Sequence, residues 1–373
     1  MISEHRIHFA DAKKMTDVAS QSVHLVVTSP PYPMIEMWDA LFCRQDSVRK
    51  ALNRPVGTEA FELMHRQLDR VWDELERVLV PGGIACINIG DATRTLDGEF
   101  ALYPNHSRIL YHMLGIGFSN LPNILWRKQT NAPNKFMGSG MMPPGAYVTL
   151  EHEYILIFRK GDKRLFKTPE AKANRRQSAF FWEERNQWFS DVWVDLKGTR
   201  QKTTDKQLRK RSGAYPFELA YRLICMFSVM GDTVIDPFMG TGTTLFAAAV
   251  TGRNSVGYEL DKAFQPLIGQ GCQQAIELGR RRIDARFEDH LQFVRNRQTE
   301  GKAIKHTNQV YGFPVMTRQE NELMIPLPET MQETAPSQFN VTYEIPELSA
   351  VGEPAAIPVK SQPKKTGQLS LFD

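Results

Sequence analysis

The feature that most constrains the fold is a pair of short motifs, each placed directly after a β-branched run. Thr28-Ser29-Pro30-Pro31-Tyr32 follows Val23–Val27, and DPFMGTGTT (236–244) follows Thr233–Ile235. Such runs are typical of buried strands. The second motif predicts a tight strand-to-helix turn, because glycines let a ligand approach the backbone and the N–H groups of the next helix face it. The sequence thus predicts two ligand-facing loops at strand ends.

The stretches between the motifs alternate between helix and strand patterns. Apolar residues recur at helical spacing from Thr58 to Val80, Pro81-Gly82-Gly83 stops them, and Ile84–Ile89 follows as a buried strand. Helix, turn and strand in this order are the usual crossover of a parallel sheet. Further strands are expected at 7–9, 123–126, 154–158 and 255–258, and helices at 107–114, 216–230, 243–250 and 263–297.

Positive charge is clustered, although the formal net charge of the 373 residues is only +4. Residues 197–211 read KGTRQKTTDKQLRKR, and Arg175-Arg176 and Arg280–Arg282 form shorter clusters. Such clusters are either solvated faces or phosphate contacts. We hypothesise phosphate contacts for Arg175, Arg176, Lys197, Arg200, Lys202, Arg209, Lys210 and Arg211.

The four cysteines, Cys43, Cys86, Cys225 and Cys272, are scattered, with no CxxC pair and no histidine at metal spacing. This pattern predicts core thiols in a reducing cytoplasm and no metal site. No secretory signal opens the sequence, and no apolar run approaches the roughly 20 residues of a membrane span. We therefore expect a cytoplasmic protein of a bacterium or archaeon with no membrane partner.

The first motif offers a hydroxyl, a carbonyl and an aromatic ring at one point. The amino group of cytosine or adenine is a poor nucleophile, because its lone pair is delocalised into the ring. The Ser29 hydroxyl and the Pro30 carbonyl can accept its two N–H bonds, and proline fixes the backbone. Tyr32 can stack on a base that has been flipped out of the duplex. Taken alone, the motif is equally compatible with an ordinary turn after a strand.

In their order along the chain, the two motifs resemble those of the circularly permuted beta group of DNA amino-methyltransferases. The resemblance covers residues 1–295 and includes Pro81-Gly82-Gly83, His152-Glu153-Tyr154 and Asp191-Val192-Trp193. It implies an α/β fold with a doubly wound, mostly parallel, seven-stranded Rossmann-like sheet, circularly permuted. The implied catalytic residues are Ser29, Pro30, Pro31 and Tyr32.

The same resemblance implies S-adenosyl-L-methionine as cofactor. Asp11 takes the place of the residue that contacts the adenine of the cofactor. Glu259 ends the strand that follows the second motif, where a carboxylate can accept both ribose hydroxyls. Ala214-Tyr215-Pro216 matches a cofactor-contacting segment, although Ser212-Gly213 stands where the family usually has His-Pro. The expected cofactor-binding residues are Asp11, Tyr215, Pro216, Asp236, Pro237, Phe238, Gly240, Gly242, Thr243 and Glu259.

A serine at the head of the first motif is similar to the cytosine-N4 members of the group. Adenine N6 is the alternative target, and a DNA-binding relative that has lost catalysis is a further one. Carbon-5 methylation is disfavoured, because it needs a Pro-Cys nucleophile and no cysteine follows a proline. The expected substrate is double-stranded DNA, in a restriction–modification setting with a cognate restriction endonuclease.

Two segments lie outside the regular alternation. Residues 161–211 are basic and rich in aromatic residues, and they form either a satellite core or a target-recognition insert. Residues 296–373 are Pro-rich and polar, and we expect an extended arm or a small appendage rather than a second core. Its residues Gln368, Leu369, Leu371 and Phe372 look like the short motif with which bacterial proteins bind the sliding clamp. Chance similarity, or a terminus folded onto the core, is the alternative.

Overall fold

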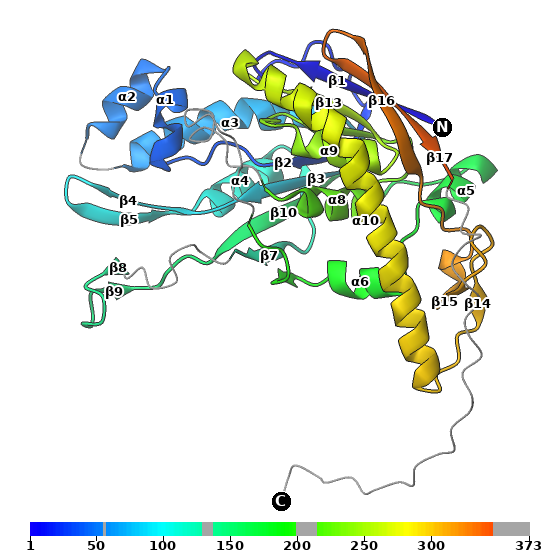
Figure 1. Cartoon of the computed structure of the whole chain (residues 1–373). Helices are drawn as coiled ribbons and strands as arrows, with labels where there is room; N and C mark the ends of the chain where they lie inside the picture. The colour runs from blue at the N-terminus through cyan, green and yellow to red at the C-terminus, as the bar shows by residue number, and fades with distance from the viewer. Residues whose placement is uncertain (55–56, 129–136, 199–214, 346–373) are drawn as a thin grey trace, which may run out of the picture.

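The computed structural model describes residues 1–54, 57–128, 137–198 and 215–345. Its centre is a sheet whose neighbouring strands follow the order β7-β10-β3-β2-β12-β13-β1 (Figure 1). β10 is antiparallel to both of its neighbours, and the other strands of this set share one direction. The bounds are β1 (Ile2–His8), β2 (Val23–Thr28), β3 (Leu79–Ile89), β7 (Ile124–Arg127), β10 (His152–Lys160), β12 (Thr233–Asp236) and β13 (Asn254–Tyr258).

These strands form the expected doubly wound, mostly parallel sheet, and β2 with the first motif precedes β12 in the chain. The complete sheet has eleven strands within the described ranges, more than the seven expected. β6 (Phe118–Asn120) and β11 (Val192–Trp193) extend it on one side, and β16 (Leu327–Ala335) and β17 (Gln338–Glu344) extend it on the other. The circular permutation of this sheet stays a prediction.

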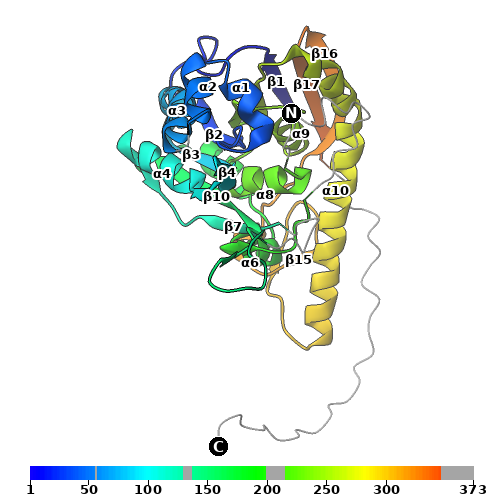
Figure 2. The ribbon, with the colours of Figure 1, turned by 90° about the vertical axis from the view of Figure 1, so that its left-hand side faces the viewer.

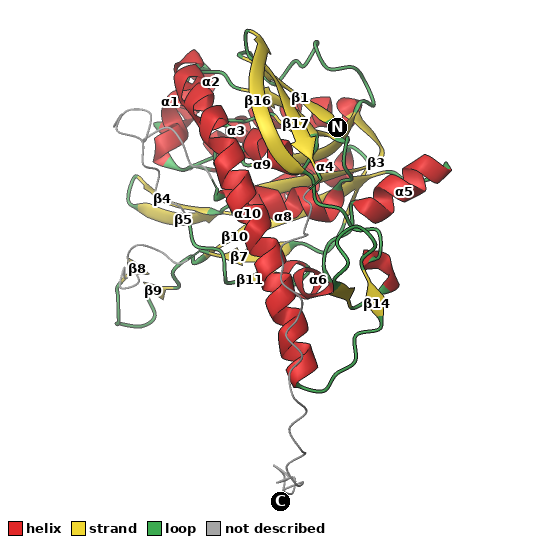
Figure 3. Cartoon of the chain, turned by 45° about the vertical axis from the view of Figure 1, so that its right-hand side comes forward, coloured by secondary structure: helices red, strands yellow, loops and turns green. Residues whose placement is uncertain are grey.

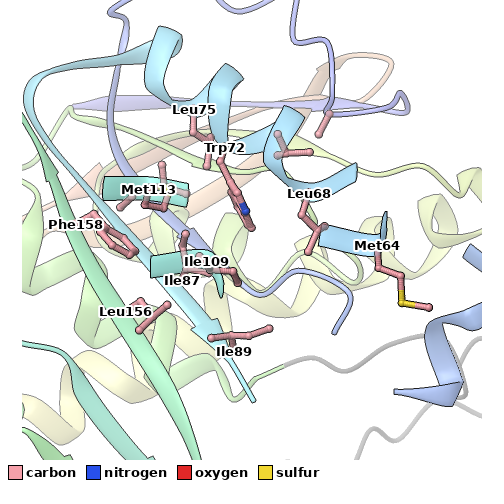
Figure 4. Packing of buried hydrophobic residues seen from close by; sticks show 14 of the residues in the cluster. Met64, Leu68, Trp72, Leu75, Ile87, Ile89, Ile109, Met113, Leu156 and Phe158 are labelled. Atoms are coloured by element: carbon pink, nitrogen blue, oxygen red, sulfur yellow. The ribbon is translucent and has the colours of Figure 1, made fainter. Parts of the chain in front are cut away.

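Helices cover both faces of the sheet, as Figure 2 shows. On β2, Val26 faces one core and its neighbours Leu25 and Val27 face the other, so successive side chains alternate between two buried layers. The first layer packs under α3 and α4, with Trp72 and Met113 over β3 and β10 (Figure 4). The second packs under α6, α8, α9 and α10.

The described helices are α1 (Asp39–Phe42), α2 (Asp46–Leu52), α3 (Thr58–Val78), α4 (Asn105–Gly115), α5 (Pro169–Gln177), α6 (Trp182–Trp188), α8 (Phe217–Phe227), α9 (Thr243–Val250) and α10 (Gln265–Thr299). Short 3₁₀ turns are η1 (Glu36–Trp38), η2 (Lys262–Phe264) and η3 (Arg318–Glu320). α3 ends two residues before the predicted limit, because the residues ahead of Pro81 take up extended backbone and begin β3.

Two hairpins project from the body of the protein in Figure 1. They are β4 (Ala92–Leu96) with β5 (Glu99–Tyr103), and β8 (Met137–Gly138) with β9 (Ala146–Tyr147). The rings of Phe100 and Tyr147 stack with centroids 4.7 Å apart and join the two hairpins. Neither hairpin was predicted from the sequence.

The expectation of an arm beginning at residue 296 is wrong for residues 296–344. α10 continues to Thr299, and β14 (His306–Thr307) and β15 (Pro314–Val315) form a small sheet beside it. β17 then pairs antiparallel with β1, and Phe313 and Val315 are buried in the second core. The short apolar patches of this segment are therefore part of the fold (Figure 3).

Within the described residues, no helix combines the length and the apolar character that crossing a membrane would require.

Candidate functional site

A cavity of about 420 Å³ opens at the carboxyl ends of β1, β2, β12 and β13. The two motifs line it together: Ser29, Pro30, Pro31 and Tyr32 from the loop after β2, and Asp236 to Gly240 with Thr243 from the turn after β12. Asp11, Tyr215 and Glu259 complete the predicted lining, and residues 35–44, around η1 and α1, border it as well. Of the predicted cofactor and catalytic residues, Pro216 and Gly242 alone do not line the cavity.

The turn after β12 has the backbone that its glycines predicted. Gly242 precedes the first residue of α9 with φ of +90°, and Gly240 has φ of +53°. A side chain at Gly242 would also press on the Phe246 ring, 3.2 Å from the position of its Cβ. Gly242 therefore shapes the turn without contacting the cavity, and Pro216 in the same way starts α8.

Asp236 is buried at the junction of the two motifs. Its Oδ1 accepts hydrogen bonds from Thr28 Oγ1 at 2.6 Å and from the Phe238 amide at 3.0 Å, and its Oδ2 accepts from Thr244 Oγ1 at 2.7 Å and Tyr215 OH at 3.2 Å. Burial raises the pKa of this carboxyl group, and these donors oppose the shift. Asp236 thus joins the end of β2 to the start of α9, a role that its position in the motif did not indicate.

Glu259, directly after β13, accepts backbone hydrogen bonds with both of its carboxylate oxygens. Oε2 accepts from the Gly240 amide and Oε1 from the Asp261 amide, each at 2.8 Å. Burial raises the pKa of Glu259, and these amide donors act in the opposite direction. Each oxygen has a second lone pair, so the carboxylate can still accept hydroxyl groups from a ligand.

Asp11 lines the cavity from the loop after β1, next to the loop that carries Glu259. Its Oδ2 pairs with Lys13 Nζ at 3.0 Å, and its Oδ1 accepts from the Lys13 amide. Asp11 and Glu259 are therefore placed on neighbouring loops of β1 and β13, at one end of the cavity.

Ser29 and Tyr32 stand at the other end and connect to residues that sequence reasoning did not select. The Tyr32 hydroxyl lies 3.2 Å from Ser29 Oγ, 2.9 Å from Asn88 Nδ2 and 3.0 Å from Glu153 Oε2. Burial first, and the nearby Glu153 carboxylate second, raise the pKa of Tyr32 well above its usual range. Glu153 and Lys128 also line the cavity.

The sequence model of the DNA methylase family, which spans N6 and N4 amino-methyltransferases, matches residues 23–270, a range that contains both motifs. The chain belongs to this family. It is 50% identical over 346 residues to the Type II methyltransferase M.MthZI of Methanothermobacter thermautotrophicus, covering 92% of this chain and 96% of that protein. It is 49% identical over 311 residues to M.MjaI of Methanocaldococcus jannaschii, covering 78% and 97%. The protein is a Type II DNA methyltransferase.

Solved structures agree with this assignment. A Thermus thermophilus protein described as a DNA modification methylase, in complex with S-adenosyl-L-methionine, is similar with a TM-score of 0.56 and 35% identity over 73% of this chain and 95% of that one. The PvuII cytosine-N4 DNA methyltransferase shares the fold, with a TM-score of 0.50 and 15% identity over 72% and 86%. The α/β methyltransferase fold of this methylase is confirmed.

The predicted phosphate-contacting cations are only partly near the cavity. Arg175 and Arg176 lie on α5, and α5 packs against Met230, which precedes β12, at the amino end of the sheet. Arg176 pairs with Glu322 at 2.8 Å, and Arg175 stacks on Phe166. The structure therefore does not bring this pair to the site, because the cavity is at the carboxyl end.

The other two basic clusters, Arg280–Arg282 and the described part of residues 197–211, differ in their surroundings. Arg280, Arg281 and Arg282 pair with Glu344, Glu277 and Glu218; the Arg282 pair is largely buried, whereas the Arg281 pair is exposed on the surface of α10. Lys197 is exposed, and its neighbour Gly198 lies against the Lys128 side chain that borders the cavity. Arg200, Lys202, Arg209, Lys210 and Arg211 lie outside the described residues, as do Gln368, Leu369, Leu371 and Phe372.

The aromatic residues of the 161–211 segment form a core within its described part. Phe181, Trp188 and Trp193 are buried against α8 and α10. Arg286 of α10 pairs with Glu184 of α6 inside this core, at 2.5 and 2.6 Å. The segment thus builds an extension of the second core, and its role in target recognition stays a prediction.

Proposed function

We propose that this methylase modifies cytosine N4 within a specific site of double-stranded DNA. The observation that supports this choice is the serine at the head of the first motif, whose hydroxyl borders the cavity beside the Pro30 backbone. A neutral hydroxyl and a carbonyl can accept the two N–H bonds of the cytosine amino group, which aims the nitrogen lone pair at the methyl donor. Tyr32 offers a ring on which the flipped base can stack.

The cofactor is S-adenosyl-L-methionine, whose sulfonium supplies an electrophilic methyl group when it is bound. The residues present fit it: Glu259 keeps free lone pairs toward the cavity, and the Gly240–Gly242 turn places backbone close to it. Asp11 and Glu259 would hold the adenosine part, and the turn after β12 the methionine part. The role of the protein is to align donor and acceptor, which is the main source of rate in a direct displacement.

Nucleoside analysis of DNA from cells that express the methylase tests the target base. We expect N4-methylcytosine from the wild type and much less of it from Ser29→Ala. N6-methyladenine in its place would contradict the cytosine assignment. Cofactor binding without any methylated base would indicate an inactive DNA-binding relative. Modification-sensitive sequencing of the same DNA gives the recognition site.

Two further partners belong to this proposal. A restriction endonuclease with the same recognition site is the functional counterpart of a Type II methyltransferase, and expression of the methylase should protect that site from cleavage. The sliding clamp is the second, through Gln368, Leu369, Leu371 and Phe372. The proposed cellular location is the cytoplasm, where both partners and the DNA are accessible.

A further inference from the structure

A chain of polar side chains leads from Ser29 away from the cavity. Ser29 Oγ is 3.2 Å from Tyr32 OH, and Tyr32 OH is 3.0 Å from Glu153 Oε2. Glu153 lies at the start of β10, beside the end of β3, where Tyr154 pairs with Ile89. The methylase thus connects its first motif to a carboxylate on a different strand.

The direction of the hydrogen bonds in this chain follows from the number of protons available. Tyr32 OH accepts from Asn88 Nδ2 at 2.9 Å and from Ser29 Oγ at 3.2 Å, and the Gly90 backbone amide donates to it as well, so Glu153 is the acceptor left for the Tyr32 proton. Its single proton is then donated to Glu153. Because the Ser29 proton points to Tyr32, the lone pairs of Ser29 are left for a group in the cavity.

The carboxylate of Glu153 is fixed through both of its oxygens. Oε2 also accepts from Asn88 Nδ2 at 2.7 Å, and Oε1 accepts from Lys128 Nζ at 2.9 Å. Gly90 permits this arrangement, since a Cβ there would lie 3.1 Å from the Tyr32 ring and 3.3 Å from Glu153 Cγ. The carboxylate therefore keeps one oxygen aimed at Tyr32.

We propose that Glu153 receives the proton that the target amino group loses, through Ser29 and Tyr32. When the amino nitrogen bonds to the methyl carbon, the C–S bond breaks, its electron pair stays on sulfur and the nitrogen becomes cationic. One N–H proton then moves to Ser29 Oγ as Ser29 passes its own proton to Tyr32 and Tyr32 passes its own to Glu153. The products are a neutral methylamino group, the neutral thioether and a protonated Glu153.

The chemistry of Tyr32 supports a relay. Burial and the adjacent carboxylate raise its pKa, so that Tyr32 stays a neutral hydroxyl that can accept one proton while giving up another. The carboxylate at the end of the chain also stabilises the positive charge that develops on the amino nitrogen. Glu153 acts through Tyr32 and Ser29 and is therefore a positioning and proton-accepting residue. The inference rests on the proposed amino-methyl transfer, whichever base is the target.

Single-turnover methylation of a short duplex with the identified site tests this relay. Glu153→Gln keeps the shape and can still accept a hydrogen bond from Tyr32, but it cannot take the proton. We expect its rate to fall by about 10²-fold or more, with DNA affinity within about threefold of wild type. Glu151→Gln is the matched control, because Glu151 pairs at the surface with Arg127 and is outside the chain of hydrogen bonds.

A double-mutant cycle separates the relay from a purely structural role. Tyr32→Phe breaks the same chain, so Glu153→Gln should slow the Tyr32→Phe protein by less than about threefold. Independent, multiplying effects would overturn the relay, as would a single-turnover rate of Glu153→Gln near that of wild type. Matching thermal melting curves exclude misfolding. A wild-type protein that transfers no methyl group to any DNA would contradict the proposed function itself, and the relay with it.

Discussion

The role proposed for the Ser29 hydroxyl, as acceptor for the target amino group, can be tested directly. Replacement of Ser29 by alanine removes the hydroxyl that faces the cavity and leaves the backbone of Pro30 in place. We expect Ser29→Ala to lower the single-turnover methylation rate by about 10²-fold or more, as for other preorganised hydrogen-bonding groups. Cofactor affinity measured by calorimetry should hardly change.

Ser22→Ala is the control for this experiment, because Ser22 precedes the same strand β2 at its far end and its hydroxyl donates to the exposed Ala19 carbonyl. It should behave as wild type. If Ser29→Ala and Ser22→Ala have equal rates, the hydroxyl of Ser29 does not take part in the reaction.

Glu259 lines the same cavity, and its proposed role is to bind the cofactor. Glu259→Ala removes acceptors for the ribose hydroxyls and also the partner of the Gly240 amide. We expect cofactor binding to weaken by roughly 1–3 kcal/mol in titration calorimetry. Wild-type affinity in that titration would remove Glu259 from the binding site. A melting temperature measured without cofactor shows how much of the loss comes from the turn itself.

At this scale the sequence predicted the residues that are local to a motif. Ser29, Tyr32 and Glu259 follow strands directly, so the strand pattern alone placed them at the carboxyl edge. Glu153 and Asn88 meet only because β10 pairs antiparallel with β3 in one register, which no local pattern specifies. Only weak features of the sequence pointed to these two residues. Asn88 is the one amide side chain in a mostly apolar strand, and Glu153 directly precedes the apolar run 154–158 that was predicted as a strand.

At the scale of elements, α6 and α10 are held together by an ion pair in the core. Arg286 and Glu184 have side chains only 5% and 11% exposed, and Arg286 also donates to the Tyr221 hydroxyl at 3.0 Å. Glu184→Ala would leave a guanidinium buried without its partner. We expect the free energy of unfolding in urea to fall by about 3–5 kcal/mol.

The neighbouring pair on α10 gives the comparison for this prediction. Arg281 and Glu277 are one helical turn apart and mostly exposed. Glu277→Ala should cost less than about 1 kcal/mol in the same titration. Similar losses for Glu184→Ala and Glu277→Ala would mean that the α6–α10 contact does not depend on the buried pair.

Elements with strong periodicity, such as α3 and β10, were predicted close to their observed limits. The β16–β17 hairpin was not, since its residues alternate between exposed and partly buried and its pairing partner, β1, lies more than three hundred residues earlier in the chain. Its apolar side chains become a core only when β1 is beside them. The composition of that segment, rich in proline and polar residues, pointed to an arm.

At the scale of the whole molecule, the catalytic body and the clamp-binding motif should act independently. Replacing Leu371 and Phe372 together by alanine should abolish binding to a bacterial sliding clamp in a pull-down. If the motif acts independently of the catalytic body, methylation of short oligonucleotides should continue at the wild-type rate. Loss of oligonucleotide methylation would mean that the tail packs on the catalytic body, and a wild-type protein that captures no clamp would end the hypothesis.

The hairpin that covers β1 also protects this edge of the sheet. Without it, β1 would present an open ladder of N–H and C=O groups to any other sheet, and such edges recruit foreign strands. The outer strand is instead β16, where Pro328 and two register shifts interrupt the ladder and Glu329 and Glu333 add negative charge. An irregular, acidic edge of that kind disfavours pairing with the strand of a second copy.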